Sequence, residues 1–369
     1  MAKTVVTFEV PLGARSYPIF LGRDLSGPIG EALTPYLAPS LNLGCVADEG
    51  VRSVGLWPET LPSETLIPLH GRGETLKAFP ALEQILETLA QRRVDRAGAV
   101  VALGGGVVGD LAGFAAASYL RGVAFFQIPT TLLAMVDSSV GGKTGINLKA
   151  GKNLAGAFWQ PKAVFIDLDM LATLPPREFA AGMAEVIKYG LLDDAEFYRE
   201  LQALGTLNAG SEALTEVVRR CCAIKAQIVA DDERETAAGG GRARLNLGHT
   251  FAHAIEAVAG YGDYLHGEAV AIGLVLAAKL SARLGGAVDA AEIDALVALF
   301  QRYNLPTDIK GEAARPLAVA DLIDVMTRDK KTRGGKLRFV VMPAIGQTEV
   351  RGGIDTALIE ELWREAGAV

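Results

Sequence analysis

Short apolar runs alternate with longer amphipathic segments through the first half of the chain. The short runs lie at 41–48, 64–71, 98–105, 122–130 and 163–169, and segments with helical periodicity occupy 76–94 and 107–120. Apolar strands separated by helices are typical of a parallel sheet covered by helices. The pattern therefore predicts an α/β domain with a Rossmann-like parallel sheet.

The pattern changes near residue 177, where alanine-rich segments with helical periodicity begin to dominate. They occupy 179–192, 213–230, 249–260 and 267–285, and one short strand is expected at 336–343. Pro175 and Pro176 in TLPPR precede a new helix start. We therefore expect an α/β domain at 1–176 and a mainly α-helical domain at 177–369.

Length, composition and charge narrow the class of protein. A chain of 369 residues, half of them hydrophobic, is long enough for two domains. With 36 basic and 43 acidic residues, a net charge of −7 and no basic tract, a nucleic-acid partner is not expected. No signal peptide and no run of 18 apolar residues is found, so we expect no membrane span. Cys45, Cys221 and Cys222 form neither a disulfide framework nor a zinc motif, which favours a reducing cytoplasm.

Three of the four histidines fall within a short stretch. His249 and His253 in NLGHTFAHAIE are four residues apart and share one helical face, a spacing that suits a metal such as zinc. His266 follows in YLHGEAVAIGL. Packing of these rings in a helix bundle, with satisfied hydrogen bonds, is the alternative interpretation.

A carboxylate in an apolar helical segment is a second candidate for metal binding. Glu185 in GMAEVIKYG lies among apolar neighbours and three residues before Lys188. A surface salt bridge is the common explanation for such a pair. A buried carboxylate, however, requires a cation or a metal.

The stretch GAVVALGGGVVGDLAGF leads from a predicted strand into a predicted helix. Gly104, Gly106 and Gly109 satisfy GxGxxG, a spacing that lets backbone amides approach a pyrophosphate. A tight turn without a ligand is the alternative. The acidic residue expected about 20 positions later is missing, and Asp48 or Glu74 could hold a ribose instead.

The segment IPTTLLAMVDSSVGGKTGINLKAGKNLAGAF is dense in small, polar and basic residues and shows no clear periodicity. A loop of about 30 residues within a compact domain is more often functional than idle, although a solvated loop is the alternative. Its ammonium and amide groups suit phosphate or carboxylate, so a polyanionic small molecule is predicted as ligand. The polar candidates here and in the second half are Asp137, Lys143, Lys149, Lys152, Asn153, Lys225, Arg242, Lys330 and Lys331.

Taken together, these segments resemble the 3-dehydroquinate synthase family of sugar phosphate cyclases in the shikimate pathway. The resemblance rests on GGGVVGDLAGF, RGVAFFQIPTTLLAMVDSSVGGKTGIN, GKNLAGAFWQP, GMAEVIKYG, NLGHTFAHAIE with HGEAVAIG, and DKK, in family order. It implies NAD bound by the α/β part and a substrate cleft between this part and the helical part.

The resemblance also implies roles for individual residues. The zinc or cobalt ligands would be Glu185, His249 and His266, with His253 on the substrate side, so the pair four residues apart would not chelate as a unit. The NAD contacts would be Asp48, Glu74, Lys77, Gly105, Gly106, Gly109, Asp110, Thr130, Thr131, Lys143, Lys152 and Thr173. The substrate contacts would be Asp137, Lys143, Asn153, Lys188, Lys225, Arg242, Asn246, His253 and one or both of Lys330 and Lys331.

The implied reaction converts 3-deoxy-D-arabino-heptulosonate 7-phosphate into 3-dehydroquinate and phosphate without net oxidation. Oxidation of one ring hydroxyl to a ketone makes the neighbouring C–H acidic, so phosphate can leave by β-elimination. Hydride return, ring opening and an intramolecular aldol closure complete the carbocycle. A homodimer is implied as well, with Arg121 in YLRGV serving the neighbouring subunit's phosphate site.

Three other functions are weighed against this one. A metal-dependent polyol dehydrogenase of the glycerol dehydrogenase type would share the domain pattern and the metal histidines. A sister cyclase would close a sugar phosphate that lacks a carboxylate. An inactive NAD-binding or regulatory protein could use the same scaffold, but the metal and substrate positions carry the expected residue types.

Overall fold

A computed structural model describes residues 5–37, 41–71, 73–237, 240–260, 262–310, 316–328 and 337–369. The chain divides into two compact units, Met1–Pro175 with Asn208–Glu233, and Pro176–Leu207 with Arg234–Val369. The segment 208–233 therefore belongs to the first unit and not, as a 177–369 domain would require, to the second.

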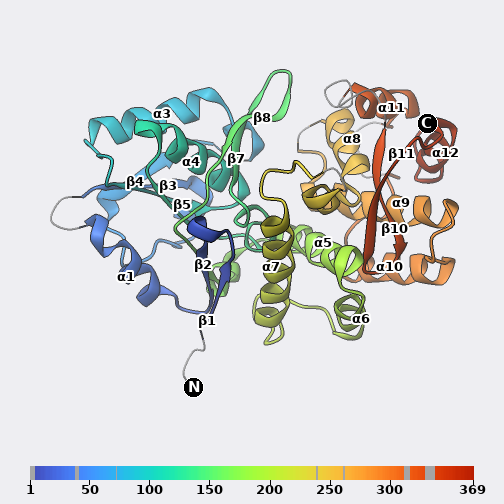
Figure 1. The fold of residues 1–369 in the computed structure, drawn as a ribbon, viewed down its shortest axis with the longest axis horizontal. Coiled ribbons are helices and arrows are strands. Elements are labelled where there is room, and N and C mark those ends of the chain that lie inside the picture. The colour runs from blue at the N-terminus through green and yellow to red at the C-terminus, as the bar shows by residue number, and fades with distance from the viewer. Residues whose placement is uncertain are drawn as a thin grey trace. The chain divides into compact units, whose positions relative to one another are not determined.

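The first unit contains a seven-stranded sheet in the order β1-β2-β9-β6-β5-β3-β4 (Figure 1). All neighbouring pairs are parallel except β1 with β2, which are antiparallel. This sheet confirms the predicted fold class, and the β1–β2 hairpin at its edge was not predicted. The strands are β1 (Val6–Val10), β2 (Tyr17–Gly22), β3 (Leu43–Asp48), β4 (Leu66–Leu69), β5 (Ala99–Gly104), β6 (Ala124–Pro129) and β9 (Ala163–Asp167).

Helices α3 and α4 pack with β3, β4 and β5 in one apolar cluster of the first unit. Val46, Leu89, Val100 and Leu111 are among its fully buried members. Strand β5 is buried along its whole length, as expected for a central parallel strand. The helices of this unit are α1 (Ser26–Leu37), α2 (Glu49–Ser53), α3 (Phe79–Gln91), α4 (Gly106–Ser118) and α7 (Leu214–Asp231).

The segment expected to be an irregular loop forms regular structure instead. A π-helical turn, η5 (Ala134–Ser138), precedes a hairpin of β7 (Lys143–Leu148) and β8 (Gly151–Phe158). Gly145 and Gly156 are paired across the hairpin, where a Cβ on either would overlap the facing backbone. Glycines and polar residues hide the alternation that marks a strand, so the sequence pattern did not predict this hairpin.

Helix α7 packs within the first unit through contacts that its sequence does not reveal. Cys222 Sγ donates a hydrogen bond to Met135 O at 3.3 Å, and Lys225 Nζ donates to Asp137 O at 2.5 Å. Helical periodicity predicts an apolar face but not the core against which that face packs. This is why periodicity places α7 in the helical domain at 177–369, whereas its contacts place it in the first unit.

The second unit is mainly helical, as predicted, and its described residues include one antiparallel pair of strands. Strand β10 matches the predicted strand, whereas β11 was not predicted. Trp363 is fully buried, with its ring 5.3 Å from that of Phe251. The elements are α5 (Pro176–Asp193), α6 (Ala195–Ala203), η7 (Gly241–Asn246), α8 (His249–Ala259), α9 (His266–Arg283), α10 (Ala290–Arg302), α11 (Val319–Arg328), β10 (Arg338–Ala344), β11 (Gln347–Gly352) and α12 (Thr356–Glu365).

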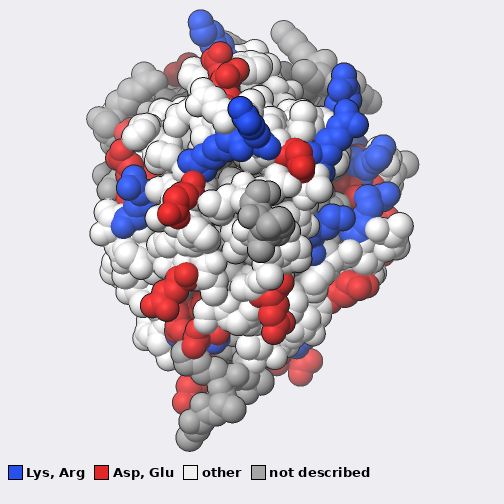
Figure 2. Space-filling model, turned by 90° about the vertical axis from the view of Figure 1, so that its left-hand side faces the viewer, with Lys and Arg blue, Asp and Glu red and all other residues white. Residues whose placement is uncertain are grey.

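The apolar character of the helices and the distribution of surface charge can both be described. In the described part of the chain, no helix combines the length and apolar character that crossing a membrane requires. Figure 2 shows a face on which basic side chains gather mainly in the upper half and acidic ones lie between and below them. This mixture of signs agrees with the near balance of 36 basic and 43 acidic residues.

Candidate active site

The carboxylate of Glu185 lies at the centre of the candidate site in the second unit. Glu185 is fully buried on α5, a helix whose residues from Phe179 to Leu192 are all buried. Lys188, one turn later, is in ion-pair contact with Glu185 Oε2. Neither oxygen of Glu185 meets hydrogen-bond geometry with a described protein donor. A buried carboxylate with this demand for donors is suited to a bound cation.

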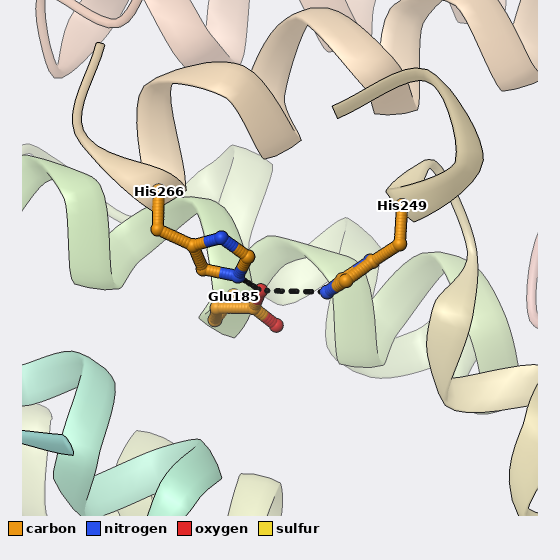
Figure 3. A group of neighbouring side chains, drawn as sticks. All are labelled: Glu185, His249 and His266. Atoms are coloured by element: carbon orange, nitrogen blue, oxygen red, sulfur yellow. Dashed lines mark ion pairs between the residues drawn. The ribbon is translucent and has the colours of Figure 1, made fainter. Parts of the chain in front are cut away.

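Two imidazoles approach the same oxygen of Glu185 (Figure 3). His249 is the first residue of α8, and His266 is the first residue of α9. The Nε2 atoms of His249 and His266 lie 3.4 Å and 3.6 Å from Glu185 Oε1. The three residues offer one ligand atom each, all within 4.8 Å of one another.

These separations fit a small divalent metal. Two ligands of a tetrahedral zinc ion, each about 2.0–2.1 Å from the metal, lie about 3.3 Å apart. The separations of 3.4 Å and 3.6 Å are close to this value. A site of one carboxylate and two imidazoles leaves a coordination position for a substrate oxygen, as a catalytic metal requires.

Burial and neighbouring charges shift the pKa values of Glu185 and His266. Burial alone would raise the pKa of Glu185, but Lys188 and the two imidazoles lower it well below its usual value. Burial lowers the pKa of His266, but Glu185 and Glu256 outweigh it and raise the pKa to about 10. The cluster therefore favours a negative charge at its centre and positive charges around it.

The Nδ1 atom of each imidazole also has a polar partner. His249 Nδ1 is 3.0 Å from Leu247 O, and His266 Nδ1 is 3.4 Å from Glu256 Oε1. If a metal displaces the proton on Nε2, a proton on Nδ1 of each ring leaves the Nε2 lone pair for the metal. Sequence reasoning missed Glu256, although a carboxylate seven residues after His249, on the same helical face, was a visible signal.

The other candidate residues of the second unit are close to His249 in the sequence, and they differ in burial. His253 is exposed, and its ring centroid is 5.6 Å from that of His249 and 6.4 Å from that of His266. Arg242 is buried and Asn246 partly buried on η7, while Arg244 forms an ion pair with Asp193. Lys330 and Lys331 lie outside the described residues.

In the first unit, the glycine-rich turn lies at the carboxyl ends of three neighbouring parallel strands. Asp48 ends β3, Gly104 ends β5, and Thr130 follows β6. The strand order reverses at β3, because β4 lies on one side of it and β5 on the other. Ligands of open α/β sheets bind at such a reversal, next to a helix N-terminus such as that of α4.

The glycines of this turn are closely packed against polar groups. A Cβ on Gly106 would lie 2.9 Å from Ser138 Oγ, and one on Gly109 would lie 3.0 Å from Gln127 Oε1. Gly105 precedes the first residue of α4 and faces Thr131. Both Gly105 and Thr131 are partly buried, so the turn leaves its backbone partly accessible.

Lys77 links three segments of the first unit. Its Nζ donates to Asp110 Oδ2 on α4 at 2.7 Å and to Asn153 Oδ1 on β8 at 2.5 Å. Asn147 on β7 donates to Glu74 Oε1 at 2.7 Å and accepts from the Asn153 amide at 2.8 Å. The network joins predicted NAD contacts to the predicted substrate contact Asn153. Asn147 was not predicted, because nothing in the pattern of its segment indicates its partner.

Burial raises the pKa of Asp110, and Lys77 offsets this effect only in part. A carboxylate in this position gains from a further hydrogen-bond donor, such as a ligand hydroxyl. Asp110 therefore remains a candidate contact for a polar ligand.

The remaining candidates of the first unit are spread over several elements. Lys225 on α7 is buried and forms an ion pair with Asp137 at 2.6 Å. Lys143 is exposed and Lys152 partly buried on the β7–β8 hairpin, and Thr173 is exposed at the end of η6 (Leu168–Thr173). Arg121 is exposed after α4, in a turn where Leu120 and Arg121 have φ values of 50° and 69°.

Solved structures that resemble this chain are sugar phosphate cyclases and, by fold alone, dehydrogenases. A solved 2-deoxy-scyllo-inosose synthase, complexed with carbaglucose-6-phosphate, NAD+ and Co2+, has a TM-score of 0.81 at 26% identity and covers 98% of this chain and 100% of its own. A 2-epi-5-epi-valiolone synthase from Streptomyces hygroscopicus, with NAD+ and Zn2+ bound, has a TM-score of 0.80 at 26% identity over 95% of this chain and 96% of its own. A probable glycerol dehydrogenase from Sinorhizobium meliloti shares the fold alone, with a TM-score of 0.57 at 16% identity over 93% of this chain and 94% of its own.

Sequence comparison narrows this class to one family. The models for 3-dehydroquinate synthase, N-terminal and C-terminal, match residues 68–181 and 182–332. A 3-dehydroquinate synthase from Opitutus terrae is 51% identical over 98% of this chain and 99% of its own length. One from Azotobacter vinelandii is 49% identical over 94% and 93%. The chain belongs to the 3-dehydroquinate synthase family.

Proposed function

We propose that this protein is a 3-dehydroquinate synthase that converts 3-deoxy-D-arabino-heptulosonate 7-phosphate into 3-dehydroquinate and phosphate in the shikimate pathway. The observation that carries the proposal is the buried Glu185 between the imidazoles of His249 and His266, in a chain of this family. The reaction is a phosphate-eliminating cyclisation, so the enzyme is a carbon–oxygen lyase.

The proposed metal is zinc or cobalt, held by Glu185, His249 and His266. The complete burial of Glu185 and the separations between its Oε1 and both Nε2 atoms support this assignment. The donor set of one hard oxygen and two imidazole nitrogens suits either ion.

The proposed NAD site is the carboxyl edge of the sheet in the first unit. The position of Asp48, the glycine-rich turn and Thr130 on neighbouring parallel strands supports it. The proposed contacts are Asp48, Glu74, Lys77, Gly105, Gly106, Gly109, Asp110, Thr130, Thr131, Lys143, Lys152 and Thr173.

The proposed substrate contacts come from both units. Cationic and amide side chains bind the phosphate and carboxylate, since charge-assisted hydrogen bonds are the strongest available to such groups. Arg242 is proposed for the carboxylate, because a planar guanidinium can bind it with two parallel hydrogen bonds. The proposed set is Asp137, Lys143, Asn153, Lys188, Lys225, Arg242, Asn246 and His253, with Lys330 and Lys331 proposed from the sequence alone.

When bound, NAD accepts and later returns one hydride, and the metal polarises the hydroxyl that is oxidised. Lys188, in ion-pair contact with Glu185, keeps a positive charge beside the metal ligands. Lys225 is a second fixed cation; it lies in the first unit and pairs with Asp137. A cation fixed in this way binds a substrate anion without losing side-chain freedom, which lowers the entropic cost of binding.

Two features support a homodimer in which Arg121 reaches the phosphate site of the neighbouring subunit. Arg121 is exposed, so its guanidinium is available to a second chain. Leu120 and Arg121 are successive non-glycine residues with left-handed φ values, a costly conformation that is concentrated at functional positions. We also propose a cytoplasmic location, because Cys45, Cys221 and Cys222 are all buried and none is joined in a disulfide.

A phosphate-release assay tests the proposed activity. The purified chain is mixed with the heptulosonate phosphate, NAD and zinc, and phosphate and 3-dehydroquinate are measured together. Equal amounts of both products are expected. Turnover of a sugar phosphate without a carboxylate, such as glucose 6-phosphate or sedoheptulose 7-phosphate, at an equal or higher rate would instead favour a sister cyclase.

A further inference from the structure

The two imidazoles of the proposed metal site are held in unequal ways. The Nδ1–H of His249 donates to the carbonyl of Leu247, a backbone group whose position is fixed by the chain itself. The Nδ1–H of His266 is directed at a side-chain carboxylate, Glu256 Oε1, at 3.4 Å. The Nδ1 atom of His266 therefore has a side-chain partner, whereas that of His249 has a backbone partner.

The side chain of His266 is also less enclosed than that of His249. Its side chain is 34% exposed, compared with 10% for His249, so surrounding atoms restrict its ring less. Glu256 is itself 8% exposed and is carried by α8, the helix that begins with His249. A contact from α8 to His266 thus joins the helices that carry the two imidazole ligands.

We propose that Glu256 is a positioning residue for the metal site, which holds His266 with its proton on Nδ1 and its Nε2 facing the metal. This inference rests on the proposed metal ligands. A carboxylate on the remote nitrogen of a ligating imidazole fixes the tautomer and ring orientation and makes the ring a stronger donor. Glu256 has this function for His266, at the long end of hydrogen-bond distance in the structure.

If Glu256 served only to pack the core, its carboxylate would not be required. A buried carboxylate destabilises a fold unless it is paired, so an apolar side chain of similar size would serve packing as well or better. Glu256→Leu keeps the volume and removes both the charge and the acceptor. Glu256→Gln keeps an acceptor oxygen and removes only the charge.

The test measures zinc binding directly. Metal-free full-length protein is titrated with zinc in competition with a chromophoric chelator, and the melting temperature of the metal-free protein is recorded. Glu256→Gln and Glu256→Leu should weaken zinc binding by about 10- to 100-fold, with the larger loss for leucine. Unchanged zinc affinity in both variants would overturn the proposal, whatever happens to the melting temperature.

Two further variants make the result specific. Glu268 is a buried carboxylate two residues after His266 that accepts from Leu265 N at 2.8 Å and pairs with Arg177. Glu268→Gln should lower the melting temperature with less than a threefold loss of zinc affinity, and an equal loss would assign the effect to general helix displacement. His266→Ala should abolish tight zinc binding. If His266→Ala binds zinc normally, the metal site itself is wrong, whereas loss in His266→Ala without loss in Glu256→Gln rejects only the role of Glu256.

Discussion

At the scale of single residues, the proposed metal site has one buried carboxylate, Glu185, among three cationic or imidazole groups. Glu185 is in contact with Lys188 and lies 3.4 Å and 3.6 Å from the imidazoles. Removing one partner would leave a buried charge with fewer compensating groups, which is more costly than losing a surface pair. Substitutions around Glu185 should therefore change both metal binding and stability.

His249→Ala and His253→Ala should separate metal binding from catalysis. His249→Ala removes a ligand atom close to Glu185, so it should lose both tightly bound metal and activity. His253 lies outside the ligand group and is exposed, so His253→Ala should keep its metal but turn over more slowly. Metal content by elemental analysis and initial rates are compared. Full metal content and rate in His249→Ala would contradict the ligand assignment.

Arg242→Ala should impair substrate binding without affecting zinc or NAD binding. Loss of one charge-assisted contact costs about 1.5–3 kcal/mol, which lowers kcat/KM by roughly ten- to a hundredfold or more. Arg244→Ala is the matched control, since Arg244 is already paired with Asp193. Steady-state kinetics with the heptulosonate phosphate measure both. A larger loss in Arg244→Ala than in Arg242→Ala would transfer the carboxylate contact to Arg244.

At the scale of elements, glycines let three helices approach closely enough to bring the proposed metal ligands together. A Cβ on Gly267, next to His266, would overlap the carbonyl oxygen of Ala181 on α5. A Cβ on Gly273 of α9 would overlap the carbonyl of Gly248, which precedes α8. Backbone atoms cannot move aside as a flexible side chain can, so the helices would have to separate.

Gly267→Ala should destabilise the fold and weaken metal binding together. Alanine gains up to about 1 kcal/mol in helix propensity, but overlap with backbone in a packed core costs roughly 1–3 kcal/mol or more. The expected net effect is a lower free energy of unfolding and a weaker zinc affinity. Gly205→Ala, in open space within the same unit, is the control and should change neither. Denaturant unfolding and zinc titration measure the effects, and a Gly267→Ala variant with wild-type values would refute the close approach.

At the scale of the whole molecule, the proposed reaction leaves the cofactor unchanged. The first unit supplies the glycine-rich turn and the Lys77 network, and the second supplies the carboxylate and the imidazoles. Polyol dehydrogenases share the fold, so the balance of oxidation decides between the two functions.

NAD should be needed only in catalytic amount, because the hydride removed early returns in a later step. Absorbance from NADH should not accumulate while phosphate is released. Parallel recording of NADH absorbance and phosphate in one reaction checks this. NADH formed in step with product would identify a dehydrogenase.

A mixture of two inactive variants should regain activity if the proposed dimer shares its sites. Arg121→Ala damages the site of the neighbouring chain, and Glu185→Gln damages the site of its own chain. After subunit exchange, some mixed dimers carry one site with neither substitution. Phosphate release from the mixture is compared with that of each variant alone. Absence of recovery, with exchange verified by a mixed-tag pull-down, would count against a shared site.

The sequence by itself determined the fold class and the position of the glycine-rich turn. Apolar runs such as 98–105 form a buried strand, and the turn after Gly104 leads into α4, because strand and helix periodicity are local properties. The family was also visible in the sequence, because its motifs keep their order along the chain. Spacing alone, however, pairs His249 with His253, four residues apart on one helix.

Periodicity and spacing did not predict which distant residues meet; the family resemblance implied Glu185, His249 and His266, and the tertiary structure brings these three together. His266, seventeen residues after His249, joins Glu185 because the start of α9 packs closely against α5. The pairing of Lys77 with Asp110, the β7–β8 hairpin and the assignment of α7 to the first unit were likewise absent from the pattern. Periodicity specifies an apolar face, but the partner of that face depends on packing between segments far apart in the chain, which no local pattern contains.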